Sequence, residues 1–474
     1  MVLATLRLLR RWFRQLAFAT VCLLTLAALF LTEENYRGRR AWESYQREAA
    51  ARGTPVEFIH DLAPPPVPDD QNFWATPLLN PLRSDGSIGS VKQTEAYGTT
   101  LTNRLAGGLQ AQRYPFYPSP GDWEFSKHIN WDEIAKYTGP TGIEHLLQQD
   151  ETEMAEISAA ARRPFGRVGT RYDLDFRPSP NFKVLRIVSW LFSLRAQAAL
   201  NAGQPALALD DILTMVRMAR LLSDEPIAVS QMISVLGLKG AIQPAWEGLS
   251  ARHWNEAQLT TLQDTFQQVD VLAQLAFCLR CGRAEWDGMP SYFEAHAADV
   301  PWSEVPAGKW GLGWFDQNVV TGDRLYLDYV LPVLDLKNRR VYPEKLADLG
   351  KEIDRVVQQW WPHCFLIKEG FPYYNKMVEE MAHTQDGVEM VVLACALERY
   401  ALAHGDYPEK LDALVPQFLA QLPHDVVTGG PLGYARTPDG RYKLTAQWHT
   451  PDANTKNDSA AGLSTDQPAW VWKY

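Results

Sequence analysis

The cysteines are the first residues in this sequence whose spacing suggests chemistry. Cys278 and Cys281 form a Cys-x-x-Cys pair, and His363 stands directly before Cys364. Such a pair performs redox chemistry when it follows a strand, and it binds zinc when two further Cys or His ligands join it. Here the pair lies inside an apolar stretch with helical spacing, which favours buried thiols. A disulfide among Cys278, Cys281, Cys364 and Cys395, or a zinc site, remains the alternative.

Acidic residues also occur in pairs. Asp210 precedes Asp211, and Glu379 precedes Glu380 shortly before His383. Adjacent residues on a helix point about 100° apart, so neither pair forms a carboxylate dyad by itself. Glu380 and His383 are three positions apart and share a helix face. We expect that face to be solvated.

Motifs of the common catalytic sites do not occur in this sequence. It contains no phosphate-binding P-loop, no His-Glu-x-x-His, no Ser-x-x-Lys and no Gly-x-Ser-x-Gly. The sequence therefore favours a protein without enzymatic activity. The alternative is an exported hydrolase whose site is assembled from distant residues.

The elements that must position any site begin with an apolar stretch at residues 16–32, which contains no charged residue. As a helix it would be roughly 25 Å long, enough to span a bilayer. Basic residues precede it and Glu33 and Glu34 follow it, so the positive-inside rule predicts a cytoplasmic N-terminus and an extracytoplasmic, periplasmic body. A cleaved signal peptide is the alternative, although no Ala-x-Ala-like cleavage site follows the stretch.

The overall composition is that of a folded, acidic protein. The chain has 474 residues, 46% of them hydrophobic, and a formal net charge of -10. That hydrophobic share supports a core. The negative charge argues against nucleic acid as a partner, because no basic stripe is available to neutralise phosphates.

The sequence divides into four segments. Residues 1–32 form a cytoplasmic tip and the transmembrane anchor, and residues 33–82 form a helical stalk followed by a Pro-rich spacer. Residues 83–384 form a mainly helical body, and residues 385–474 form a smaller module. Within the body, residues 83–140 and 286–322 are rich in turn-forming residues, so we expect long loops there.

The strongest helical periodicity lies in residues 181–222. Apolar residues recur at helical spacing on both sides of Asn201-Ala202-Gly203, and Pro205 suits the first turn of the second helix. Two helices joined by a tight turn resemble a tetratricopeptide-type hairpin. Because no clean repeat of that length follows, we predict an irregular helical domain, with further helices at about 227–249 and 255–284.

The C-terminal module combines a helix with strands. An apolar helical pattern ends at His404-Gly405, and the segments around Tyr434 and Tyr442 flank an Asp439-Gly440 turn typical of a hairpin. The predicted fold is therefore mainly α, with an N-terminal transmembrane helix, an irregular helical body with a tetratricopeptide-like hairpin, and a small α+β C-terminal module.

Two resemblances accompany this pattern. The run ALERYALAHGDYPEKLDAL, followed by LPHD and TGGPLGYARTPDGRYKL, resembles the globular end of the major pseudopilin of type II secretion. Together with the anchor, the Pro-Pro-Pro-x-Pro spacer and the helical middle, it also resembles a group of uncharacterised bacterial membrane-anchored proteins. The anchor lies far from the module and lacks a prepilin-peptidase site, so we do not expect assembly as a pilin subunit.

The pseudopilin resemblance implies a calcium site in the last loop. Oxygen ligands suited to calcium are present there, although the family's Ser-x-Gly-x-Asp-Gly stretch is replaced by Ala446-Gln447-Trp448-His449-Thr450. An exposed polar loop without a cofactor is the more common explanation of such residues, and calcium binding is the alternative. The candidate calcium ligands are Asp452, Asn454, Asn457, Asp458 and Asp466. Taken together, the sequence predicts a membrane-anchored, non-enzymatic protein that binds a protein partner in the envelope or in a secretion-related assembly.

Overall fold

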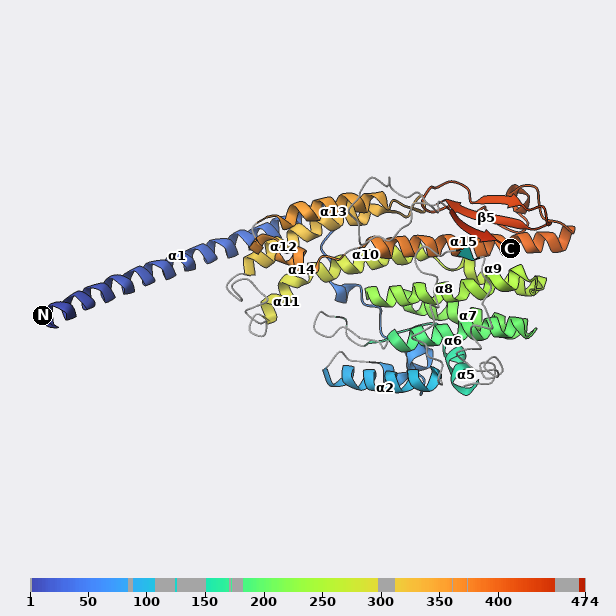
Figure 1. Cartoon of the computed structure of the whole chain (residues 1–474), viewed down its shortest axis with the longest axis horizontal. Helices are drawn as coiled ribbons and strands as arrows, with labels where there is room; N and C mark the ends of the chain where they lie inside the picture. The colour runs from blue at the N-terminus through green and yellow to red at the C-terminus, as the bar shows by residue number, and fades with distance from the viewer. Residues whose placement is uncertain are drawn as a thin grey trace. The chain divides into compact units, whose positions relative to one another are not determined.

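The computed structural model confirms a mainly helical chain with a few strands near the C-terminus (Figure 1). It describes residues 2–83, 88–106, 124–125, 151–169, 172, 182–296, 312–359, 361–372, 374–447 and 469–473. The chain divides into two compact units. Unit 1 comprises Met1–Phe58, Arg283–Asp328 and Asp348–Pro372, and unit 2 comprises Ile59–Gly282, Tyr329–Ala347 and Tyr373–Tyr474.

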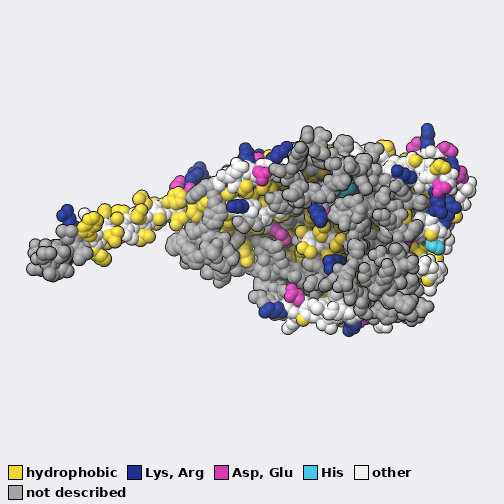
Figure 2. Space-filling model, viewed as in Figure 1, with side chains coloured by type: hydrophobic (Ala, Val, Ile, Leu, Met, Phe, Trp, Pro, Cys, Tyr) yellow, Lys and Arg dark blue, Asp and Glu magenta, His cyan; other side chains and the backbone are white. Residues whose placement is uncertain are grey.

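Unit 1 begins with one unbroken helix, α1 (Val2–Ala51). Its stretch Arg10–Ala51 is long and apolar enough to cross a membrane, as the sequence predicted. Figure 2 shows hydrophobic side chains along the protruding part of this helix, with charged side chains towards each end. Large side chains such as Phe18 and Leu23 are exposed there, which suits a lipid-facing surface.

The expected stalk after residue 32 is helical, but it is not a free stalk. From Glu34 onward α1 packs along α12 (Leu312–Leu325), and Tyr45 and Ala49 are buried against Val320. Gly38 and Gly313 allow the two helices to touch at their backbones, because a Cβ on Gly38 would lie 2.1 Å from the carbonyl oxygen of Gly313.

The remainder of unit 1 closes around aromatic side chains. Phe315 of α12 meets Phe365 edge to face at 5.0 Å between ring centroids, and Trp286 meets Phe371 at 5.4 Å. Residues 286–322 were expected to be a long loop, but two helices lie there, because α12 gains its stability from packing on α1 and Trp286. Further helices with residues in this unit include α11 (Met289–His296), α13 (Glu344–Val357), η8 (Trp361–His363) and α14 (Phe365–Gly370).

Unit 2 is built on a stack of helices (Figure 1). The predicted hairpin is confirmed: α6 (Phe182–Asn201) and α7 (Pro205–Ser223) flank the turn at Ala202 to Gln204, and both pack on α8 (Ala228–Ser250). The stretch predicted as one helix at 255–284 is instead two, α9 (Glu256–Gln267) and α10 (Val271–Asp287), and α10 ends in unit 1. The long helix α15 (Asn375–His404) packs on α8 and α9.

Residues 83–140 contain a helix where loops were expected. Helix α2 (Ile88–Ala106) packs on α6 and buries Thr94, Leu101 and Leu105 on one face. The sequence hides this face because threonine and glycine occupy some of its positions. Shorter elements before and after it are η1 (Ile59–Asp61), η2 (Asp69–Gln71), η3 (Phe73–Ala75), η4 (Asn80–Leu82) and α5 (Glu151–Ala160).

Three C-terminal strands and the distant strand β1 form a four-stranded sheet in the order β1-β6-β5-β4. The predicted hairpin is confirmed, since β4 (Gly433–Arg436) pairs antiparallel with β5 (Tyr442–Gln447) across the Asp439-Gly440 turn. Strand β6 (Ala469–Lys473) pairs antiparallel with β5 and parallel with β1 (Glu124–Phe125). The remaining short elements are η6 (Tyr326–Val330), η7 (Leu331–Val333), β2 (Leu334–Asp335), β3 (Arg340–Val341) and η9 (Leu411–Leu414).

Candidate functional site

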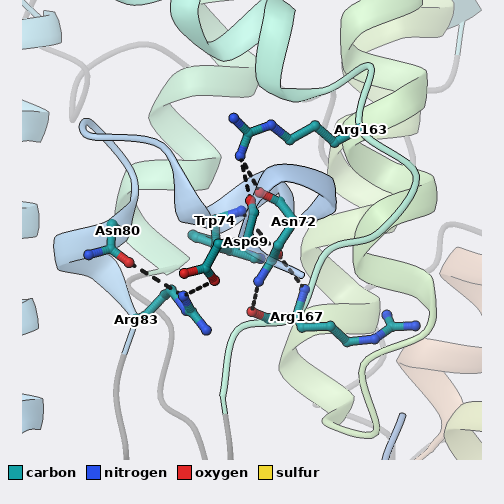
Figure 3. A network of polar contacts seen from close by, with 7 residues as sticks. All are labelled: Asp69, Asn72, Trp74, Asn80, Arg83, Arg163 and Arg167. Atoms are coloured by element: carbon teal, nitrogen blue, oxygen red, sulfur yellow. Dashed lines mark hydrogen bonds and ion pairs between the residues drawn. The ribbon is translucent and has the colours of Figure 1, made fainter. Parts of the chain in front are cut away.

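The site candidate in unit 2 is organised by the segment at residues 163–168, which follows α5. Asn72, which is buried, holds this segment through its side chain (Figure 3). Its Oδ1 accepts from the Arg167 backbone N–H at 2.9 Å, and its Nδ2 donates to the Arg167 carbonyl oxygen at 3.0 Å. Arg163 adds hydrogen bonds to the carbonyl oxygens of Asp69 and Asn72. The backbone on both sides of the Arg167 side chain is therefore fixed.

A buried carboxylate holds the same segment from the other side. Glu225 accepts a hydrogen bond from the Val168 backbone N–H at 3.1 Å and one from the Tyr172 hydroxyl at 2.7 Å. Glu225 is fully buried, and this desolvation raises its pKa to about 7 although both hydrogen bonds oppose the shift. Because its oxygens are used to order backbone and Tyr172, we interpret Glu225 as a positioning residue.

Arg167 itself is 7% exposed. Its Nη1 lies 3.6 Å from a carboxylate oxygen of Asp224, too far for a hydrogen bond, and its guanidinium stands over the Phe165 ring. Neither its Nε nor its Nη1 donates a hydrogen bond to any residue that the structure describes. Buried donors without acceptors are rare and costly, so this guanidinium is the candidate binding group of unit 2.

Arg167 lines a cleft of about 430 Å³, which we call the Arg167 cleft. Its walls come from the end of α7, from α8, from the turn between α9 and α10, and from the first half of α10. Such a volume lies in the range of about 300–1,000 Å³ that is typical of ligand sites. The charged lining residues are Arg167, Arg220, Asp224 and Asp270, and the apolar ones include Leu238, Val269 and Phe277.

Most other polar groups of the cleft are already engaged. Arg220 donates to the Gln268 side-chain oxygen at 2.7 Å, and Asp270 accepts from Arg339 at 2.9 Å. The Ser234 hydroxyl donates to the Ala219 carbonyl oxygen at 2.7 Å. No His or Cys is among the described lining residues. The arrangement offers the Arg167 guanidinium beside an apolar wall.

Comparison of the chain with known protein families, curated proteins and solved structures found no match. The geometry of the chain is therefore the basis for assigning its function.

The candidate calcium ligands Asp452, Asn454, Asn457, Asp458 and Asp466 all lie outside the described residues. The structure says nothing of that loop. Within the part of the chain that is described, no group of three or more acidic, His or Cys side chains is arranged to hold a metal ion.

The cysteine motif lies in the core. Cys278, Cys281, Cys364 and Cys395 are buried, and the Cys278 sulfur lies 3.6 Å from that of Met377. His363 approaches a carboxylate oxygen of Glu34 at 3.6 Å. These residues are therefore packing and ion-pairing groups in the structure, in line with the preferred interpretation of the sequence.

The acidic pairs separate as helix geometry requires. Asp210 binds Arg162 at the surface, whereas Asp211 is buried and accepts two hydrogen bonds from Arg195, at 3.0 and 2.6 Å. The expectation of a solvated face for Glu380 was wrong, because α8 covers it and Glu380 pairs with the buried Lys239.

Burial lowers the pKa values of two neighbouring residues, Lys239 and His383. Desolvation lowers the pKa of Lys239 to about 7, and desolvation together with the Lys239 charge lowers the pKa of His383 to about 3. Since the two groups belong to the packed interface of α8 and α15, we interpret them as structural.

Unit 1 contains a second buried ionic cluster. Arg283 donates to both carboxylate oxygens of Asp323, at 2.5 and 3.0 Å, while Asp287 lies 3.7 Å from the same guanidinium. Both aspartates are fully buried. Desolvation and the neighbouring Asp323 raise the pKa of Asp287 to about 9, so Asp287 is protonated at neutral pH.

Sequence reasoning missed Arg167 as a candidate. The residues that hold it, Asn72 and Glu225, are far from it along the chain, and no local motif joins the three. The one available signal was a charged residue in the short segment between a helix and Tyr172, which is too common to single out.

Proposed function

We propose that this chain is a single-pass membrane protein whose body lies outside the cytoplasm and binds another component of the cell envelope, without catalysing a reaction. The observation that carries the proposal is the continuity of α1. One helix runs from the apolar stretch into the core of unit 1, with no flexible linker between the two.

The contacts at the end of the apolar stretch support an anchor that is kept rather than cleaved. Glu34 is 4% exposed and accepts hydrogen bonds from Arg37, Trp314 and Gln317 at 2.8, 3.2 and 3.3 Å. The Gly313 backbone N–H donates to the Asn35 side chain at 2.9 Å. The first residues beyond the membrane are therefore part of the fold of unit 1.

A binding role is favoured by the Arg167 cleft. It offers a preformed space, a fixed guanidinium and an apolar wall, but no pairing of nucleophile and base among its described lining residues. Preorganised groups of this kind lower the entropic cost of association. The end of α15, where Leu402 is 60% exposed, offers a second surface for a partner.

Orientation in the membrane is tested by labelling single cysteines with a membrane-impermeant maleimide. Lys351, whose side chain is 77% exposed, and Arg10, which precedes the apolar stretch, are each replaced by Cys in a background with Cys22→Ala. The four remaining native thiols are buried and serve as the unlabelled blank. The proposal expects labelling of Lys351→Cys in intact spheroplasts and of Arg10→Cys only after lysis. The reverse pattern refutes the orientation.

Partner binding is tested with a photo-crosslinking amino acid in the full-length chain. One variant carries it at Ala273, which lines the Arg167 cleft, and another at Leu402, which is 60% exposed near the end of α15. A third, at Lys351, serves as the surface control. A crosslink to an envelope protein from the first or second position, but not from the third, supports binding and locates it. Absence of any envelope protein at both positions contradicts the proposal.

A further inference from the structure

The Arg167 guanidinium needs an acceptor that the described chain does not give it. An arginine side chain stays charged and carries five N–H donors. Asp224 partly offsets the charge, but its own side chain is 62% exposed and its oxygen lies beyond hydrogen-bond distance. Nε and Nη1 therefore have no hydrogen bond to any described residue, and the Arg167 residue lines an open space of about 430 Å³.

The position of this guanidinium is set before any ligand arrives. The Asn72 side chain binds the backbone N–H and carbonyl of Arg167, and Glu225 binds the backbone N–H of Val168. Figure 3 shows the Arg167 side chain running away from this network. A ligand that meets a side chain held in this way loses little affinity to reorganisation of the site.

The charges of the lining select the kind of anion. Arg167 and Arg220 are balanced by Asp224 and Asp270, so the lining has no net formal charge. Asp224 and Asp270 repel a doubly charged phosphate about twice as strongly as a singly charged carboxylate, so the lining favours the singly charged anion. The planar guanidinium also matches the two oxygens of a carboxylate.

The remaining wall selects the body of the ligand. Leu238, Val269 and Phe277 line the cleft together with Arg167. Phe277 is half-buried and offers apolar surface to a ligand, whereas Leu238 and Val269 are 1% and 7% exposed and belong mainly to the core. Burial of apolar ligand surface on such a wall contributes favourably to binding.

We infer that the Arg167 cleft binds a monocarboxylate attached to an apolar group, with Arg167 donating hydrogen bonds to the carboxylate oxygens. This inference rests on the proposed binding function and names its ligand class. The carboxylate belongs either to the free C-terminus of a peptide or to a small carboxylic acid, since both present the same group.

The test is a titration of the full-length chain in lipid nanodiscs with matched acids and amides, followed by saturation-transfer NMR. The probes are the peptide N-acetyl-Ala-Ala-Phe, 3-phenylpropanoate, the amide of each, and inorganic phosphate, with empty nanodiscs as the blank. The expected result is that an acid binds at least roughly ten-fold more tightly than its amide and than phosphate, because a hydrogen bond to a charged partner is lost. Equal affinity of acids and amides overturns the inference, as does binding of none of the probes.

Variants assign the effect to the cleft. Arg167→Gln is expected to remove the preference for the acid, while Arg162→Gln, which changes an exposed arginine that is paired with Asp210 outside the cleft, retains it. Ala273→Trp keeps Arg167 and fills the cleft from an exposed position on α10, so it should abolish binding even if Arg167→Gln fails to fold. Unchanged acid binding in folded Arg167→Gln or Ala273→Trp protein overturns the inference.

These experiments distinguish a peptide C-terminus from a small carboxylic acid as the ligand. They also test the ligand class separately from the proposed function. Tighter binding of the peptide acid than of 3-phenylpropanoate indicates a peptide C-terminus, and the reverse indicates a small acid; both support a carboxylate site. If no acid binds but the crosslink from Ala273 to an envelope protein persists, the ligand class is wrong and the proposed function stands. If acids bind and no envelope protein crosslinks, the cleft serves a small ligand and the proposed function fails.

Discussion

The ionic cluster of unit 1 predicts that replacing a buried aspartate will stabilise the protein. One guanidinium, Arg283, faces two fully buried carboxyl groups, and it can offset the charge of only one. Asp323 makes both short hydrogen bonds to Arg283. Asp287 accepts only a long one, at 3.4 Å from the Glu57 backbone N–H, and its Oδ1 has no partner among the described residues. Asp287 is therefore the group that holds a proton.

The magnitude follows from linkage between protonation and folding. The pKa of Asp287 is about 9 in the folded chain against 3.8 for an ordinary aspartate, so the folded state binds one more proton between these pH values. Stability from this group is fully present below pH 3.8 and is lost as pH rises towards 9, by up to about 1.4 kcal/mol per pH unit. Holding this proton on Asp287 at pH 7 lowers the free energy of unfolding by on the order of 4 kcal/mol. An uncharged asparagine at this position would not lower it in this way.

The variant Asp287→Asn should therefore raise the stability of unit 1 at pH 7 and leave it nearly unchanged near pH 4. Thermal unfolding of detergent-solubilised protein, measured from pH 5 to pH 8, should show a weaker pH dependence in the variant than in the wild type. The neighbouring groups Tyr45, Arg283 and Asp323 are unchanged in both proteins, so they cancel in the comparison.

A direct assay is the infrared carbonyl band of a protonated carboxylic acid. The band should be present in the wild type at pH 7 and reduced in Asp287→Asn, whereas Asp348→Asn, which changes an exposed aspartate, should not alter it. Lower stability of Asp287→Asn at pH 7 with an unchanged infrared band would mean that Asp287 is ionised, and the reasoning from charge balance would be refuted.

Three further substitutions test other parts of the fold. Gly38→Leu should destabilise unit 1 by roughly 1–3 kcal/mol or more, because a Cβ at this position has no room. Gly350→Ala, in an open helical position, is the control and should be neutral or stabilising. Equal melting temperatures of the two variants would contradict this prediction. Lys239→Met should lower the free energy of unfolding by about 3–5 kcal/mol, because it leaves Glu380 buried without its partner. The double variant Lys239→Met with Glu380→Leu should restore most of that free energy, as measured by denaturant unfolding. A double variant as unstable as the single one would argue against a buried ion pair. Asn72→Ala should increase hydrogen exchange of the 163–168 segment by releasing the Arg167 backbone, and unchanged exchange would exclude that role.

The sequence predicted those elements whose signals are local. The break at Asn201-Ala202-Gly203 and the Asp439-Gly440 turn were placed correctly because turn geometry depends on a few adjacent residues. Helix α12 was missed for the opposite reason. Gly313 and Gly322 look like helix breakers in the sequence, but they are the positions where α1 and Trp286 come close to the α12 backbone. A glycine kept for close approach is locally indistinguishable from one that ends a helix.

The candidate site was beyond local reasoning. Arg167 becomes a binding candidate only because Asn72 and Glu225, distant in sequence, fix its backbone and because no described acceptor reaches its Nε and Nη1. Periodicity describes which face of an element is apolar, and it carries no information on which polar groups meet across elements. The burial of Glu380 beneath α8 escaped prediction for the same reason.

The direct approach of Gly38 to Gly313 fixes the rotational phase of α1 relative to α12. An α-helix turns about 100° per residue, so a single inserted residue between the apolar stretch and Gly38 would swing the apolar side chains of that stretch by that angle relative to the rest of unit 1. If the stretch spans a bilayer as we propose, a change in bilayer thickness that tilts α1 would be transmitted directly to unit 1, because α1 is one unbroken helix.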